Sequence, residues 1–274
     1  MQLVQLQSAK GRFERQGLGL AAISYDSEAI LKDFTARKNV SYPLLSDPGS
    51  ATIRAYDVLN QEATGFQVGM ARPGYFFIDT KGVIREKFFE TKFQERFSPN
   101  NVVGKLFPEL AQEVSPPIEA PHLRLTTEQS DRTAFPGTRV ALTLEVQLPA
   151  DMHVYAPGVQ GYKPIQLVID SEPGIGLSPA VYPQAKILYL PAIKERVPVF
   201  EGTFRIVQDF TVSSAAEFSN SLGTSGKTAA IKGTVSYQAC DKKICYLPST
   251  VPVEWQVQIF PLDRQRVPNE IQHK

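Results

Sequence analysis

The chain contains two cysteines, Cys240 and Cys245, and their spacing points more directly to chemistry than any other feature of the sequence. Four residues separate them, and strand-like alternating segments lie on both sides, which predicts a β-hairpin whose loop the cysteines flank. Facing positions across a hairpin fall within the roughly 4.4 to 6.8 Å between Cα atoms that a disulfide can bridge. A disulfide is therefore compatible with this hairpin.

Redox exchange is the favoured interpretation of the pair, because a bond that closes so short a loop constrains the unfolded chain only weakly. Alternation from Ile231 to Ala239 predicts that Cys240 lies on the outward face, where its sulfur is accessible. Lys242 and Lys243 in the loop favour the thiolate and Asp241 opposes it, so we expect a modestly lowered thiol pKa. The competing interpretation is an ordinary structural disulfide of a secreted β-sandwich.

Length and composition exclude several other classes of function. A chain of 274 residues suits two domains, and its 29 basic and 28 acidic residues nearly cancel, so no nucleic-acid partner is predicted. No run of about 18 apolar residues occurs, so no transmembrane segment is predicted. No phosphate-binding glycine motif or serine nucleophile elbow appears. The histidines lack zinc-ligand spacing, so we predict neither a metal site nor a cofactor, and we interpret His122 and His273 as incidental.

The first 110 residues alternate between helix-like and strand-like patterns. Apolar residues at helical spacing predict a first helix that ends at Gly17, and Ser27 and Asn39 are suitable caps for a second helix. Residues 18–24 form a nearly unbroken apolar run, typical of a strand covered on both faces in a parallel sheet. The further elements that we expect are a strand at 42–47, a short helix at 51–58, a hairpin at 75–89 and a helix at 98–106.

This order of elements is typical of a thioredoxin-type α/β sheet from its first major helix onward. Three segments, Phe13–Ser27, Tyr42–Pro48 and Arg72–Asp79, resemble the peroxiredoxin-like AhpC/TSA redoxin family, and the resemblance covers roughly residues 1–110. It implies a thioredoxin-like fold in which Pro73 stands where that fold carries a cis-proline beside its active site.

The family places a strand and a cysteine-bearing turn before the helix that begins here at Met1, and residues 1–110 contain no cysteine. A thiolate is the attacking species in peroxide reduction and in disulfide exchange, so we expect this domain to be catalytically inactive as given. A natural loss of the active site and a start assigned at an internal methionine both explain the pattern. We favour the second, because an uncapped first helix beside a strand without neighbours leaves a core face uncovered.

Clustered prolines at residues 111–121 predict a semi-rigid linker, and from Leu123 onward the apolar pattern has a period of two. Short strands separated by Pro and Gly turns predict an all-β immunoglobulin-like sandwich over residues 122–264, with a polar tail at 265–274. The clearest strands are expected at 140–148, 165–169, 204–212 and 251–259, and residues 213–227 are expected to form a surface loop.

Within this domain, Val235–Pro252 resembles the N-terminal periplasmic domain of the thiol:disulfide interchange protein DsbD, chiefly through Tyr237-Gln-Ala-Cys240 and Cys245-Tyr-Leu-Pro248. The resemblance extends over roughly residues 122–262. It implies an immunoglobulin-like sandwich that exchanges electrons with thioredoxin-like or membrane thiol-disulfide proteins, with Cys245 as the attacking thiol and Cys240 as its resolving partner. Periplasmic or other extracytoplasmic location is implied as well.

Other residues are candidates for auxiliary roles at this site. Met152–Tyr155 matches an aromatic segment of that family, with His153 in place of a tyrosine, and makes His153 and Tyr155 candidates. His153 is either a proton carrier beside the sulfurs or, as we favour, a solvated or hydrogen-bonded structural histidine. The candidate cap over the disulfide is the loop Leu188–Phe200, which contains Glu195 and Phe200 and is followed by Glu201.

The sequence thus predicts a thiol-disulfide oxidoreductase that relays electrons through Cys240 and Cys245, beside a redoxin domain that is inactive as given. Two alternatives remain: a non-enzymatic binding module with a structural disulfide, and an AhpC/TSA-type peroxidase in a full-length form. The N-terminal residues have no basic segment followed by an apolar one, as a secretory signal would. Because the disulfide points to an oxidising compartment, we expect an export signal to precede them.

Overall fold

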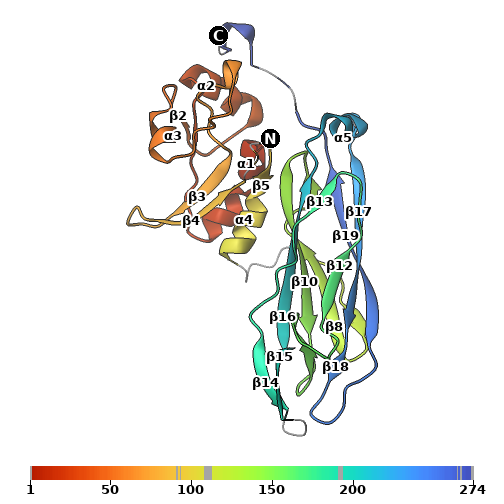
Figure 1. Ribbon diagram of the computed structural model, residues 1–274. Coiled ribbons are helices and arrows are strands. Elements are labelled where there is room, and N and C mark those ends of the chain that lie inside the picture. Colours follow the sequence, from red (N-terminus) through yellow and green to blue (C-terminus); the bar gives the residue numbers. More distant parts are fainter. Residues whose placement is uncertain are drawn as a thin grey trace.

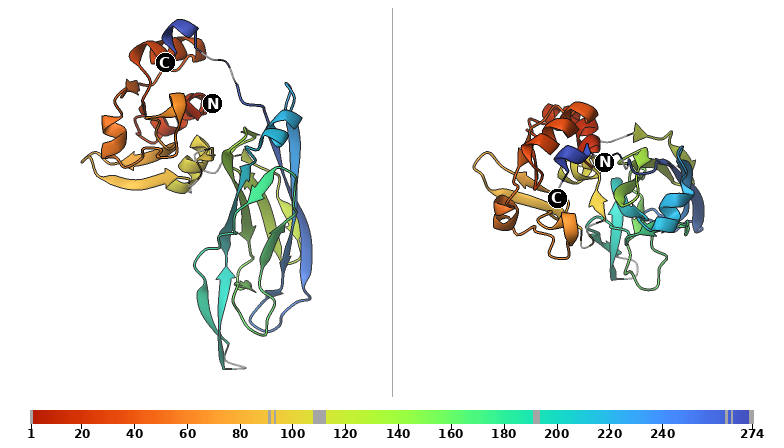
Figure 2. Two further views of the ribbon diagram at one scale, coloured as in Figure 1. Left: turned by 45° about the horizontal axis from the view of Figure 1, so that its top comes forward. Right: turned by 90° about the horizontal axis from the view of Figure 1, so that it is seen from above.

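The computed structural model describes residues 2–90, 92, 94–107, 113–190, 194–263, 265 and 267–272. A smaller unit of helices and short strands lies beside one end of an elongated β-rich unit (Figure 1), and the C-terminal segment returns to the smaller unit near α2 (Figure 2). The predicted end of the first domain at residue 110 falls within residues 108–112, which lie outside the described residues. His273, which we interpret as incidental, lies outside them as well. In the part of the chain that is described, no helix is long and apolar enough to cross a bilayer.

The N-terminal unit follows the predicted order of elements. Ser27 accepts a hydrogen bond from the backbone nitrogen of Ile30, and Asn39 ends the same helix in the left-handed conformation at φ 50°, so both predicted caps are confirmed. The elements are α1 (Gln2–Arg15), β1 (Ala22–Ser24), α2 (Glu28–Lys38), β2 (Leu44–Ser46), α3 (Ala51–Ala55), η1 (Gly65–Gln67), β3 (Gly74–Ile78), β4 (Ile84–Phe89), β5 (Arg96–Phe97) and α4 (Pro99–Leu106).

The prediction that residues 18–24 form a strand covered on both faces is wrong. Only Ala22–Ser24 is a strand, and β1 pairs in parallel with β2 in a sheet of two strands. Ala22 and Leu44 pack against the cluster that contains residues of α1, whereas Ile23 and Leu45 on the opposite face are 41% and 51% exposed. The apolar run therefore marks one covered face, and an unbroken run alone does not distinguish one covered face from two.

The β-rich unit contains two sheets whose inner faces share one hydrophobic core. Along β10 buried and partly exposed residues alternate, and Leu142, Leu144 and Trp255 belong to the core, so the predicted period of two is confirmed. One sheet contains β13 (Ile175–Leu177), β16 (Thr203–Val212), β10 (Thr138–Gln147), β8 (Leu123–Gln129), β6 (Glu113–Val114), β7 (Ile118–Ala120) and β5; the other contains β12 (Gln166–Ile169), β17 (Lys227–Tyr237), β19 (Ser249–Ile259) and β9 (Thr133–Ala134).

A further sheet, β14-β15-β11-β18, extends from the same unit. Its strands are β14 (Lys186–Leu190), β15 (Glu195–Glu201), β11 (His153–Tyr155) and β18 (Ala239–Cys240). A small cluster formed by Tyr155, Val197, Val199 and Cys240 lies between these strands, apart from the main core. This sheet positions the cysteines, and β18 lies toward the end of the unit that is remote from α1 to α4 (Figures 1 and 2).

The expected surface loop at residues 213–227 is also wrong in part, because it contains helix α5 (Ala216–Ser221). Phe218 and Leu222 are one helical turn apart, and both pack against the main core, where Leu222 is 3% exposed. Packing of these two apolar side chains outweighs the weak helix propensity of the neighbouring Ser and Asn residues.

The two units are joined by strand pairing and by buried carboxylates. β5 pairs in parallel with the start of β10 at Thr138 and Arg139, and α4 follows directly. Asp131 is 9% exposed and accepts hydrogen bonds from the side chains of Ser98 and Asn100 at the start of α4. Part of the predicted proline-rich linker also belongs to the sheet, since β6 and β7 pair with β8.

A second buried carboxylate strengthens this junction. Asp209 accepts a hydrogen bond from Asn101 Nδ2 at 3.2 Å, and Lys105 Nζ lies 3.1 Å from its other oxygen. Arg139 adds a contact between the units, donating from Nη2 to Glu90 at 2.9 Å. Since buried polar groups with partners are costly to separate, the contacts favour a fixed arrangement of the two units.

We predict that Asp131→Ala lowers the free energy of unfolding by about 2–4 kcal/mol, because the buried donors of Ser98 and Asn100 lose their acceptor. Urea denaturation followed by circular dichroism measures the effect. The control is Asp263→Ala, which removes an exposed contact to Lys38 of α2 and should cost less than about 1 kcal/mol. Equal losses for the two variants would contradict the importance of the buried network.

Candidate functional site

Cys240 and Cys245 form a disulfide with a Cα–Cα distance of 4.0 Å, somewhat shorter than the range expected for facing hairpin positions. The two residues form an antiparallel bridge. Two backbone hydrogen bonds of 2.9 Å close the turn: Asp241 N donates to Ile244 O, and Tyr246 N donates to Ala239 O. The predicted hairpin with its cysteines flanking the loop is therefore confirmed.

The two sulfurs differ in exposure, and the prediction of an outward Cys240 is wrong. Cys240 is 1% exposed, whereas Cys245 is exposed. The alternation of β17 ends at Tyr237, and the chain then leaves that sheet so that β18 pairs with β11 instead. Ala239 and Cys240 are consequently both buried, and Cys245 is the exposed residue of the pair.

Hydrogen bonds organise the charged residues of the loop. Asp241 Oδ1 accepts hydrogen bonds from the backbone nitrogens of Lys243 at 2.6 Å and Ile244 at 2.8 Å. These bonds lower the pKa of the Asp241 carboxyl, and the bond from Ile244 contributes most. Lys242 Nζ lies 2.5 Å from Asp151 Oδ1, so its charge is compensated. The expected contribution of Lys242 to a lowered thiol pKa is therefore weakened, and the lowered thiol pKa stays a prediction.

Two stacked tyrosines lie beside the exposed sulfur. The Tyr155 hydroxyl is 3.5 Å from Cys245 Sγ, and its ring stacks on that of Tyr162 with centroids 4.4 Å apart. Tyr162 donates a 2.7 Å hydrogen bond to Glu195, which raises the pKa of Tyr162 to about 12. Burial raises the pKa of Tyr155. Both phenols therefore keep their protons at neutral pH, and Tyr155 can donate to a thiolate at Cys245.

His153 lies opposite Cys240 in the pairing of β11 with β18 and opposite Glu201 in the pairing with β15. It is 4% exposed, and its ring meets that of Tyr155 edge to face at a centroid distance of 5.6 Å. Burial is the largest cause that lowers the pKa of His153. His153 Nε2 is buried and has no hydrogen-bond partner among the described residues, whereas Nδ1 is not among the buried unpartnered atoms. Whether His153 is a proton carrier or a structural histidine stays a prediction.

The predicted cap loop contains β14 and β15, which pair antiparallel, and residues 191–193 lie outside the described residues. Leu188 and Leu190 pack against the small cluster that contains Cys240, so these strands cover the buried sulfur with aliphatic side chains. Phe200 does not belong to this cover, because it packs in the main core with its ring 4.7 Å from that of Phe204.

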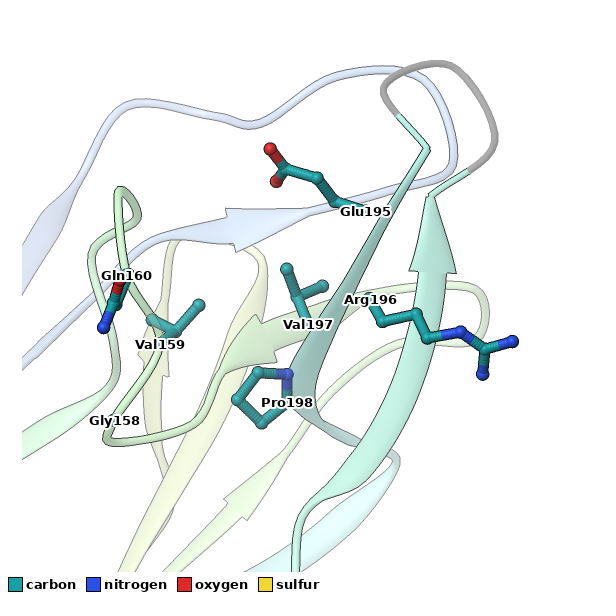
Figure 3. A pocket seen from close by; sticks show the side chains of 7 residues that line it. All are labelled: Gly158, Val159, Gln160, Glu195, Arg196, Val197 and Pro198. Atoms are coloured by element: carbon teal, nitrogen blue, oxygen red, sulfur yellow. The ribbon is translucent and has the colours of Figure 1, made fainter.

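A groove of about 400 Å³ lies between β15 and the loop at residues 158–160 (Figure 3). Its apolar part contains Val159 and Val197, while the side chain of Arg196 points away from them (Figure 3). Glu195, the acceptor for Tyr162, is part of the lining. The lining residues are Gly158, Val159, Gln160, Glu195, Arg196, Val197 and Pro198.

Two residues depart from their sequence-based interpretation. His122, interpreted as incidental, stacks on Tyr246 next to Cys245 with ring centroids 3.7 Å apart. No local pattern predicts this contact, since the two rings come from distant parts of the chain. Pro73 immediately precedes β3 in the N-terminal unit, remote from β18 (Figures 1 and 2), and the described residues contain no cis peptide bond. The expected cis-proline is therefore absent.

A redoxin-like α/β unit and a β-rich unit that carries a disulfide together support a thiol-disulfide redox role in general terms. Residues 1–87 match the AhpC/TSA family, and residues 124–255 match the family "Thiol:disulfide interchange protein DsbD, N-terminal". Both resemblances drawn from the sequence are thereby confirmed.

Peroxiredoxin TSA1 of Saccharomyces cerevisiae is 36% identical over 91 residues, which cover 31% of this chain and 44% of that protein. Alkyl hydroperoxide reductase E of Mycobacterium tuberculosis is 34% identical over 86 residues, covering 31% of this chain and 53% of that protein. The chain thus spans about half the length of these curated relatives.

Similar solved structures include the N-terminal periplasmic domain of ScsB from Proteus mirabilis, with 11% identity and a TM-score of 0.35 over 54% of this chain and 52% of that chain. The reduced N-terminal domain of DsbD from Neisseria meningitidis has 13% identity and a TM-score of 0.28, covering 43% of this chain and 76% of that chain.

We predict that Tyr155→Phe raises the pKa of the Cys245 thiol in the reduced protein by about half a unit to one unit, because the thiolate loses a hydroxyl donor. The pH dependence of iodoacetamide alkylation measures this pKa. Tyr246→Phe is the control, since that hydroxyl donates to Asp241 rather than to sulfur. Indistinguishable profiles for wild type and Tyr155→Phe would contradict the predicted donation.

Proposed function

We propose that this protein is a thiol-disulfide oxidoreductase that relays electrons through Cys240 and Cys245. The observation that carries the proposal is the unequal exposure of the two cysteines, with Cys245 exposed and Cys240 1% exposed. Access to a sulfur decides which one an incoming thiolate attacks, and a single accessible sulfur directs the exchange to one position.

The proposed exchange proceeds in two steps. A thiolate of a partner protein attacks Cys245 Sγ, the bond to Cys240 breaks, and the electron pair leaves with the Cys240 sulfur. A second thiolate from the partner then attacks the mixed disulfide and releases Cys245, so the partner is oxidised and the pair is reduced. In the opposite direction, Cys245 is the attacking thiol and Cys240 the resolving one, the roles implied by the similarity to DsbD N-terminal domains.

The proposed partners are thioredoxin-like or membrane thiol-disulfide exchange proteins, in the periplasm or another extracytoplasmic compartment. A disulfide persists in such compartments, and the match to the DsbD N-terminal family points the same way. For the domains we propose a redoxin domain over 1–110, a linker over 111–121 and an immunoglobulin-like sandwich over 122–264. Residues 1–110 contain no cysteine, so we assign them no part in the electron transfer of this chain.

A structural disulfide in a binding module is the second candidate, and the burial of Cys240 favours it. Cys240 packs with Tyr155, Val197 and Val199, as a stabilising bridge would. A reduction potential below about −300 mV and no reaction with thioredoxin-like proteins would support this candidate. Retained partner binding after both cysteines are replaced by alanine would support it further.

We predict that Cys240→Ser accumulates a mixed disulfide through Cys245 with a thioredoxin-like protein that retains one active-site cysteine, activated as its thionitrobenzoate disulfide, because neither protein then has a thiol that can resolve the adduct. Mass spectrometry after alkylation identifies the adduct. Cys245→Ser is the matched control and should accumulate at least about tenfold less adduct, since its remaining sulfur is buried. Equal trapping by the two variants would contradict the assigned roles, and no trapping by either would contradict electron relay.

A further inference from the structure

The side chains of His153 and Cys240 lie on the same face of the sheet. The two residues are directly opposite each other in the antiparallel pairing of β11 with β18. Directly opposite residues have neighbouring side chains, with Cβ atoms about 4.5–5.5 Å apart. Both are at least nine-tenths buried, with exposures of 4% and 1%. The imidazole is therefore a neighbour of the buried sulfur rather than of the exposed one.

His153 Nε2 has no partner among the described residues while the disulfide is intact. A buried polar atom without a hydrogen bond destabilises the fold, so such an atom calls for an explanation. A disulfide sulfur carries no proton, whereas a thiol or thiolate can share one with an imidazole nitrogen. Reduction would thus create, on the residue directly opposite His153, a proton-sharing group that the oxidised protein lacks.

We propose that His153 stabilises the Cys240 sulfur as it leaves the disulfide, by holding one proton between its Nε2 and that sulfur. This inference rests on the proposed exchange at Cys245 and adds a positioning residue that determines how readily Cys240 leaves. A buried thiolate without a partner is costly, and a thiol of lower pKa leaves faster, so a proton held at this position accelerates the exchange.

The step conserves atoms and electrons. The attacking thiol first loses its proton to solvent, and its thiolate forms a bond to Cys245 Sγ. The bond between the two protein sulfurs breaks, and its electron pair goes to Cys240. Cys240 and His153 Nε2 then take up one proton from solvent and share it. This proton balances the one that the attacking thiol released.

The charged surroundings allow the imidazole to respond. Glu201 faces His153 from β15, and Asp241 follows Cys240; both carboxylates favour a proton on the ring, while burial opposes it more strongly. Lys186 pairs with Glu201 and Lys243 interacts electrostatically with Asp241, whereas Lys242 pairs with Asp151. A thiolate at Cys240 would add a third negative charge to the carboxylates of Glu201 and Asp241. Unlike these two, it would belong to a residue that is buried opposite His153.

The wild-type protein provides the first test, which requires no substitution. Long-range ¹H–¹⁵N spectra recorded against pH give the pKa and tautomer of His153 in the oxidised protein and after reduction with dithiothreitol. We expect the pKa of His153 to rise by about one unit or more on reduction, because a proton on the ring then pairs with the Cys240 sulfur. An unchanged pKa and an unchanged Nε2 signal would overturn the inference.

Variants provide the second test. We expect the disulfide of His153→Phe to be reduced by 2-mercaptoethanol about tenfold more slowly than that of the wild type, after correction for the thiolate fraction of the reagent. We also expect the corrected reduction rate to increase at mildly acidic pH in the wild type and not in His153→Phe. His122→Phe is the matched control, because that exposed ring stacks beside Cys245 without reaching the buried sulfur. Parallel pH profiles for wild type and His153→Phe would overturn the inference.

The two proposals fail in distinguishable ways. If Cys240→Ser traps no partner, the proposed exchange fails, whatever His153 does. If that variant traps a partner but the pKa of His153 is the same in both redox states, the exchange stands and the role of His153 is refuted.

Discussion

The change of sheet between β17 and β18 is the constraint on which the candidate site depends. If the alternation of β17 continued past Tyr237, Cys240 would point outward and both sulfurs would be accessible. Instead the chain joins β11, and the Cys240 sulfur is sealed under the aliphatic residues of β14 and β15. A disulfide with one sealed and one open sulfur has a defined point of attack and a defined leaving group.

The groups around the two sulfurs differ accordingly. Cys245 faces a phenol that keeps its proton and can donate a hydrogen bond, and the neighbouring Tyr162 is held by Glu195. Cys240 faces an imidazole whose Nε2 has no partner in the oxidised protein, as far as the described residues show. Each sulfur thus has its own polar neighbour, and both neighbours, Tyr155 and His153, are buried at 1% and 4% exposed. Inside the protein the dielectric constant is low and each contact matters more.

The N-terminal unit contributes to architecture rather than to this site. Its last strand and helix, β5 and α4, bind the β-rich unit through paired backbone and through the buried Asp131 and Asp209. These contacts hold it at the end that is remote from β18 (Figure 1). A partner thiol that approaches Cys245 therefore meets the cap strands β14 and β15 and the cysteine loop, and the redoxin-like surface lies away from it.

The sequence by itself determined most of the elements, the two family resemblances and the hairpin that pairs the cysteines, because caps, apolar periodicity, sequence motifs and a hairpin loop are local properties. The helix α2 could be bounded from its caps, Ser27 and Asn39, and the strand β10 from the alternation around Leu142 and Leu144. Only the tertiary structure decided which sulfur is exposed, because burial of Cys240 follows from its pairing with a strand that lies far away in the sequence. The same holds for His153, His122 and Asp131, whose environments come from distant segments and leave no local pattern.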